Sequence, residues 1–178
     1  MEDTYIQIID DILPDRVNKK IIYNLITKNY FKISHDNINT IEDIHFYLTE
    51  DGKDMGFNFY SFNKETNVFL NSPISTYADI IFSKIKQKIN FNIKDLVRCN
   101  WNYYTKNSET NLHRDKNEKN YISILYNLHT NDGGTEINNV FYPSISGQAI
   151  LFKSNQLHKG FGPKSIKSRF NLNIVAEI

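Results

Sequence analysis

The sequence predicts a mainly β fold of the α+β class, with helical and strand support in the first half and a sandwich or jelly roll in the second. From Val97 to the C-terminus one β-type run follows another, and Gly, Pro, Asn and Ser residues separate them. Short strands at such spacing are typical of sandwiches and jelly rolls. The chain of 178 residues contains no repeat or linker. We therefore expect a single domain, with 1–96 as the support and 97–178 as the core.

The N-terminal support begins with a predicted strand at 5–9. Pro14 suits the first turn of a helix, and an apolar face with helical spacing follows it; this face comprises Val17, Ile21, Ile22, Leu25 and Ile26. Aromatic and β-branched residues then predict strands at 30–34, 44–48 and 57–62, with a loop at 51–54.

A second helix is predicted from Thr76 to about Ile89. Thr76 to Asp79 resembles a capping box with Asp in place of Glu. The residues expected on the buried face are Tyr77, Ile80, Ile81, Ile85 and Ile89. Lys84, Lys86 and Lys88 fit a solvated face better than a nucleic-acid patch at the formal net charge of +1.

The C-terminal core begins with an alternating run at 97–104. Because side chains alternate along a strand, Trp101 and Tyr103 should lie on one face, with Asn100, Asn102 and Tyr104 on the other. Further strands are predicted at 121–128, 134–137, 148–152 and 169–175.

Composition excludes several classes of function. The near-zero net charge argues against nucleic acid and anionic membranes as partners. Cys99 is the only cysteine, so no intramolecular disulfide can form, and its apolar surroundings predict a buried, inert thiol. The N-terminus lacks a recognisable secretory signal. The sequence contains no run of about eighteen apolar residues, the length that a membrane-spanning helix needs. We expect a cytoplasmic protein, and the sequence leaves its oligomeric state open.

Three residues form a potential metal site. His113 and Asp115 are two positions apart, so they point to the same side of an extended segment. His158 could complete a set of two imidazoles and one carboxylate, the ligands of many non-haem Fe(II) oxygenases. Arg169 offers a planar fork for a carboxylate. Each residue alone has an ordinary explanation as a solvated or packed side chain, and zinc could use the same three ligands.

From about Val97 onward the chain resembles the 2-oxoglutarate- and Fe(II)-dependent dioxygenase superfamily, in its prolyl-4-hydroxylase-like branch. The matching pieces stand in the family's order: Tyr104, His113-Arg114-Asp115, Tyr126-Asn127-Leu128, Gly133-Gly134-Thr135-Glu136, Pro143, 147–152, His158 and Arg169. Two details depart from the family, which often has Thr at the position of Glu136 and places its basic residue one position before Arg169. The resemblance implies a double-stranded β-helix that binds Fe(II), 2-oxoglutarate and O2 and hydroxylates an organic substrate.

The resemblance also implies roles for individual residues. His113, Asp115 and His158 would hold the iron, and Arg169 and Tyr104 would contact the cosubstrate. The pair Gly133-Gly134 is expected to make a turn near the mouth of the site, or a plain hairpin turn. Among the other histidines, His129 could line the entrance, whereas His35 and His45 are expected to be structural or exposed.

The prime substrate is expected to be a small molecule or a peptide, with a peptidyl or free amino-acid side chain such as proline as the first candidate. Two alternatives stay open. One is a cupin-like metal enzyme that does not use 2-oxoglutarate, and the other is a non-catalytic jelly-roll binding module.

Overall fold

The computed structural model describes residues 5–27, 44–47, 56–69 and 72–178. The strand predicted at 30–34, the loop at 51–54 and His35 lie outside these residues, and the His45 side chain is not described. The elements in chain order are β1 (Ile6–Ile9), α1 (Asp15–Thr27), β2 (Ile44–Tyr47), β3 (Gly56–Asn63), β4 (Val68–Phe69), α2 (Pro73–Lys86), β5 (Asp95–Thr105), β6 (Tyr121–Asn127), β7 (Asn131–Ile137), β8 (Val140–Ser144), β9 (Ala149–Lys153), β10 (His158–Phe161) and β11 (Ser168–Glu177).

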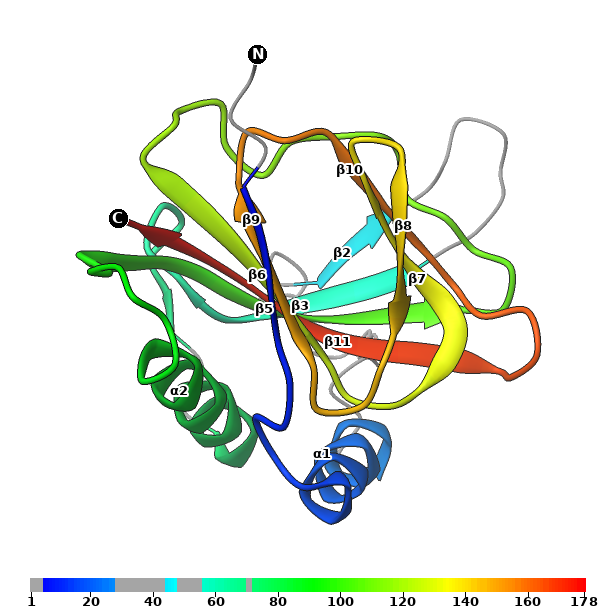
Figure 1. Cartoon of the computed structure of the whole chain (residues 1–178). Helices are drawn as coiled ribbons and strands as arrows, with labels where there is room; N and C mark the ends of the chain where they lie inside the picture. The colour runs from blue at the N-terminus through cyan, green and yellow to red at the C-terminus, as the bar shows by residue number, and fades with distance from the viewer. Residues whose placement is uncertain (1–4, 28–43, 48–55, 70–71) are drawn as a thin grey trace.

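Two antiparallel sheets form the predicted jelly roll. The large sheet has the order β1-β9-β6-β11-β5-β3-β2, and β4 pairs with β3 at its edge. The small sheet has the order β10-β7-β8. Figure 1 shows both helices on one side of the large sheet and the small sheet on the other. The double layer of strands and its helical support confirm the predicted fold class. Neither helix in the described part of the chain is long and apolar enough to cross a membrane.

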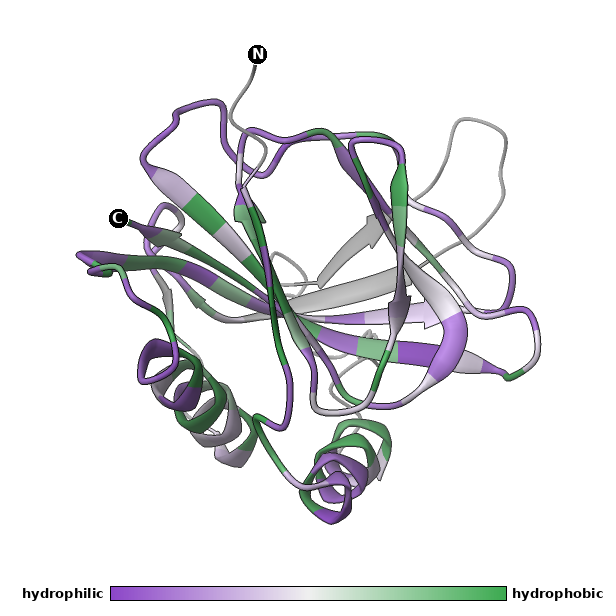
Figure 2. Cartoon of the chain, in the orientation of Figure 1, coloured by the Kyte–Doolittle hydropathy of each residue, from purple (hydrophilic) through white to green (hydrophobic). Residues whose placement is uncertain are grey.

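The main apolar core lies between the helices and the large sheet. Ile21 and Leu25 from α1 and Ile81 and Ile85 from α2 are buried there against Trp101 of β5. Figure 2 shows that the apolar residues of α1 lie on the side turned toward the sheet. Burial of a single large aliphatic side chain contributes about 1.5–3 kcal/mol, so this layer supplies much of the stability.

Two residues predicted on the buried helix faces are exposed, which corrects the sequence analysis. Ile26 is 58% exposed and Ile80 is 41% exposed. Each lies next to a fully buried neighbour, and only a narrow stripe of a helix can touch a sheet. The second helix also starts earlier than predicted, because Pro73 occupies its first turn and Ser72 precedes it in an extended conformation.

The opposite face of the large sheet is polar and faces the small sheet. The predicted alternation along β5 is confirmed, because Trp101 packs in the main core and the side chains beside it in sequence line a pocket on the other face. The register of β5 against β11 pairs Asn100 with Asn173, Asn102 with Asn171 and Tyr104 with Arg169. These pairs form successive rows of polar side chains across the barrel interior.

The Gly133-Gly134 pair does not make a turn, contrary to the prediction. Both glycines lie within β7, where the pairing with β8 shifts register between Asn131 and Gly134. A Cβ atom on Gly134 would lie 2.3 Å from the carbonyl oxygen of Tyr142. The glycine is therefore needed for close approach of two strands.

Candidate functional site

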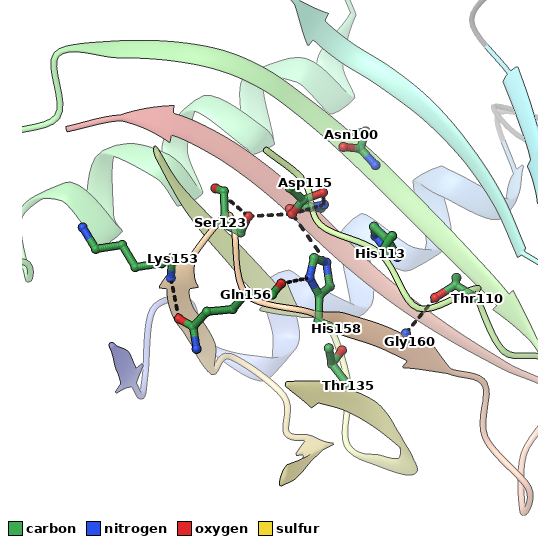
Figure 3. Close-up of polar contacts among 12 residues, drawn as sticks. Asn100, Thr110, His113, Asp115, Ser123, Thr135, Lys153, Gln156, His158 and Gly160 are labelled. Atoms are coloured by element: carbon green, nitrogen blue, oxygen red, sulfur yellow. Dashed lines mark hydrogen bonds and ion pairs between the residues drawn. The ribbon is translucent and has the colours of Figure 1, made fainter. Parts of the chain in front are cut away.

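Two chain segments bring the three predicted metal ligands together. His113 and Asp115 lie in the segment between β5 and β6, and His158 is the first residue of β10. The backbones of the two histidines pair, with His113 N donating to His158 O at 3.0 Å and His158 N donating to His113 O at 2.9 Å. One ligand atom from each of the three residues lies within 4.8 Å of the others. Figure 3 shows the three side chains converging.

Backbone carbonyls fix which nitrogen of each histidine is available. His113 Nδ1 lies 2.8 Å from the Asn111 oxygen, and His158 Nδ1 lies 3.0 Å from the Gln156 oxygen. A carbonyl oxygen only accepts hydrogen bonds, so each Nδ1 carries a proton, and in the neutral tautomer this leaves the lone pair of Nε2 for a metal. Burial holds the pKa of His158 below its ordinary value, which favours the neutral ligand form.

Three side chains hold the Asp115 carboxylate. Ser123 Oγ donates to Oδ2 at 2.5 Å, Arg98 Nη2 forms an ion pair with Oδ1, and Asn173 Nδ2 lies 3.4 Å from Oδ1. Burial alone would raise the pKa of Asp115, but the charge of Arg98 and the Ser123 hydrogen bond outweigh it, so the pKa is lowered. The carboxylate is therefore ionised and oriented, with Oδ2 3.6 Å from His158 Nε2.

The donor set fits a divalent first-row metal ion. Two neutral imidazole nitrogens and one carboxylate oxygen reach a common point from one side. Such a facial set leaves coordination positions free for a cosubstrate and O2. The hydrogen-bonded partners behind the ligands are those that usually orient a metal site.

Arg169 is completely buried, and the acceptors that it contacts among the described residues are all neutral. Its Nη1 donates to the Gly134 oxygen at 2.5 Å, and its Nη2 donates to Thr135 Oγ1 at 3.0 Å. Its Nε has no hydrogen-bond partner among the described residues. Burial lowers the pKa of Arg169 to about 10, so the group stays charged at neutral pH. A buried cation without a counter-ion is costly, and an anionic ligand would compensate it.

Tyr104 lies beside Arg169 at the same end of the pocket. The guanidinium carbon of Arg169 lies 5.0 Å from the centre of the Tyr104 ring. A Cβ atom on Gly160 would lie 2.5 Å from the Tyr104 hydroxyl oxygen, so the glycine makes room for that hydroxyl. Tyr104, Thr135, Gly160 and the metal-site residues line one pocket, and Arg169 lies directly behind Tyr104 and Thr135.

Several residues of this pocket were missed by the sequence analysis. They are Arg98, Asn100, Asn102, Thr110, Arg114, Leu125 and Asn173. The alternation along β5 was a usable signal for Arg98, because Arg98 and Asn100 have the same parity as Tyr104. His129 does not line this pocket, contrary to its suggested place at the entrance. Its Nε2 lies 3.0 Å from the Ser168 oxygen.

Comparison with known proteins finds similarity in structure alone. No protein-family model and no curated protein sequence matches the chain. A prolyl-4-hydroxylase from Pseudomonas putida superposes with a TM-score of 0.65 at 11% identity, covering 99% of this chain and 94% of that one. The viral collagen prolyl hydroxylase of Paramecium bursaria Chlorella virus-1, solved with 2OG, gives 0.64 at 14% identity, covering 99% and 98%.

A third similar structure is the Trichoplax adhaerens prolyl hydroxylase in complex with a peptide fragment of the hypoxia inducible factor oxygen degradation domain. It superposes with a TM-score of 0.66 at 12% identity, covering 97% of this chain and 83% of that one. At such low identities the likeness establishes the jelly-roll fold alone.

Proposed function

We propose that this protein is an Fe(II)- and 2-oxoglutarate-dependent dioxygenase that hydroxylates an organic substrate. The observation that carries the proposal is a facial ligand set, His113, Asp115 and His158, in a pocket whose wall at Tyr104 and Thr135 covers a buried cation. This cation, Arg169, has no acidic partner among the described residues. A metal ligand set alone would suit many enzymes. The buried charge of Arg169 adds the requirement that the ligand be an anion.

The arrangement matches a dicarboxylate with a chelating end. Asn173, which contacts Asp115, and Arg169 lie on the same face of β11, about 13 Å apart along the strand at the usual rise per residue. 2-Oxoglutarate would bind the metal through its 1-carboxylate and keto oxygen and place its far carboxylate beside Arg169, Tyr104 and Thr135.

When bound, iron and 2-oxoglutarate would supply the oxidising power that inserts an oxygen atom from O2 into a C–H bond. The chain's own residues bind and orient these groups. The carbonyls of Asn111 and Gln156 hold both imidazoles in the metal-binding tautomer. Ser123 and Arg98 hold the carboxylate, and the buried rear wall keeps water from the Arg169 charge.

The prime substrate is proposed to be a peptide or a small molecule. A peptidyl or free amino-acid side chain such as proline is the first candidate. The three similar structures described above are all named as prolyl hydroxylases, and one was solved with a peptide. The low net charge and the absence of a basic groove in the described residues do not favour nucleic acid.

Anaerobic titration with Fe(II) and 2-oxoglutarate tests the function directly. The wild-type protein should bind one iron and develop the visible charge-transfer band that chelation of 2-oxoglutarate produces. The double variant His113→Ala/His158→Ala should do neither while keeping its far-UV circular dichroism spectrum. Full iron stoichiometry in that variant would contradict the assignment. Iron binding without succinate release from 2-oxoglutarate in air would favour a cupin-like enzyme, and absence of metal binding would favour a binding module.

A further inference from the structure

We propose that the end of the pocket on the far side of Asp115 from Arg169 binds the carboxylate of the prime substrate, and that this substrate is a free α-amino acid. The subsite consists of Arg98, Asn100 and Asn173 in the wall and Arg114 at the rim. The inference rests on the proposed dioxygenase function, because it assigns Arg169 to the cosubstrate and this second set of cations to the substrate.

The strand register separates the two ends of the pocket. Arg98 and Tyr104 point to the same face of β5 and are about 20 Å apart along the strand at the usual rise. Asp115 lies at the Arg98 end, where Arg98 holds its Oδ1 atom. Asn100 lies one pair further along β5 and opposite Asn173 on β11. Figure 3 shows Asn100 above Asp115 and His113, on the opposite side of them from Thr135.

In the proposed complex the positive charges at the pocket outnumber the negative ones by two. Asp115 is the only carboxylate among the described residues that line the pocket, whereas Arg98 and Arg114 both line it. In the proposed complex the two carboxylates of 2-oxoglutarate and that of Asp115 balance the divalent metal and Arg169. The charge of Arg114 and that of Arg98, which shares Asp115 with the metal, then remain without a further anion in the pocket. These two charges would attract an anionic substrate and orient it in the pocket.

Arg114 is held in place by a backbone carbonyl of the segment between β9 and β10. Its Nε donates to the Asn155 oxygen at 2.8 Å, and the side chain is otherwise exposed at the pocket. This hydrogen bond orients the guanidinium group of Arg114 and leaves its two terminal nitrogens able to donate to a carboxylate. A guanidinium fork is well suited to that task.

Buried polar atoms without a partner indicate the rest of the ligand. Asn100 is 4% exposed and Asn173 is 7% exposed, and the Oδ1 atom of each lacks a hydrogen-bond donor among the described residues. The buried Nε of Arg98 likewise lacks an acceptor there. Leaving such groups unsatisfied is costly. A carboxylate accepts from the arginines and a neighbouring ammonium group donates to the amide oxygens, so an α-amino acid satisfies both kinds of atom.

The test compares acids with their amides. The full-length protein, loaded with Fe(II) and 2-oxoglutarate in air, is offered each proteinogenic L-amino acid and, separately, its α-carboxamide. Succinate released above the level without added substrate is measured. At least one free acid should stimulate release roughly 10–100-fold more efficiently than its amide, the ratio expected for loss of a charge-assisted hydrogen bond. Arg114→Gln should raise the KM for that acid by a similar factor.

Controls separate this subsite from the metal site. Arg16→Gln makes the same change at an exposed position on α1 and should retain the wild-type KM. Arg98→Lys keeps the charge but loses the fork, and should raise the KM less than Arg98→Gln. The charge-transfer band is recorded for every variant, because Arg98 also contacts Asp115.

Equal stimulation by acids and amides, or stimulation by no amino acid, would overturn the inference while the band and the unstimulated succinate release still supported the dioxygenase function. Absence of both the band and any succinate would overturn the proposed function, and the substrate inference with it.

Discussion

At the scale of single residues, the most informative group is the guanidinium of Arg169. It is fully buried beside Tyr104, Thr135 and three other oxygen or aromatic partners, none of them charged. Folding desolvates this cation and leaves its Nε unpaired. Such a group is tolerated in a folded protein where a ligand later provides the missing charge.

Replacing Arg169 should therefore act mainly on the cosubstrate. Arg169→Ala should weaken 2-oxoglutarate binding by roughly 3–5 kcal/mol, because its far carboxylate would be buried without a charge partner. Arg169→Lys should recover only part of this loss. Tyr104→Phe should cost about 1–3 kcal/mol, the range for a hydrogen bond to a charged group. Anaerobic titration of the charge-transfer band gives the dissociation constants, and an unchanged constant in Arg169→Ala would refute the role.

At the same scale, the sequence predicted the three candidate metal ligands that the structure brings together, but not the groups that contact them. His113, Asp115 and His158 were predictable because their residue types and their order resemble a known family. Ser123 and Arg98 were not, because each is an ordinary polar residue in a strand and its contact with Asp115 bridges segments far apart in sequence. Only the closed barrel shows that this polar face of the sheet is its inside.

At the scale of elements, periodicity predicted β5, β6, β9, β11 and both helices to within a few residues. It failed for β10, the strand that provides His158. The stretch His158-Lys159-Gly160-Phe161 has one strong β-former and a glycine, so its local preference for a strand is weak. It becomes a strand by pairing with β7 and with His113, which are distant partners.

The two neighbouring isoleucines of α2 provide a matched test of how this helix supports the sheet. Ile81 is fully buried and Ile80 is 41% exposed. Ile81→Ala should lower the free energy of unfolding by about 2–5 kcal/mol, because it leaves a cavity between α2 and the sheet. Ile80→Ala should change it by about 0.5 kcal/mol or less. Urea denaturation followed by circular dichroism measures both, and equal losses would show that α2 packs differently.

At the scale of the whole molecule, metal binding should tie together segments from distant parts of the chain. The segment containing His113 and Asp115 is attached to β10 and to the end of β9 by backbone hydrogen bonds, including Asp115 N to Ser154 O at 3.0 Å. A metal ion would add three bonds across the same junction. The small sheet, through β10, is thereby joined to the large sheet, through β5 and β6.

Binding of a divalent metal should consequently stabilise the entire fold. A metal at a free concentration of 100 times its dissociation constant should add about 2.7 kcal/mol to the free energy of unfolding. Mn(II) is a suitable probe, because it is stable in air. The melting temperature should rise on adding Mn(II) to the wild-type protein and fall again with a chelator. A similar rise in the His113→Ala/His158→Ala variant would place the bound metal elsewhere.

The two faces of the large sheet have a consequence for how this protein can change. One face, which contains Trp101 and Leu172, is packed against the helices, while the other presents Asn100, Asn102 and Asn173 to the pocket. Because side chains alternate, one position on a strand packs against the helices and the next lines the pocket, so the two can change independently. Asparagines of the inner face can be exchanged without disturbing the apolar layer, so new specificities are accessible by single substitutions. A mutant library confined to the inner-face positions of β5 and β11 should retain folding while it varies the molecules that the pocket accepts.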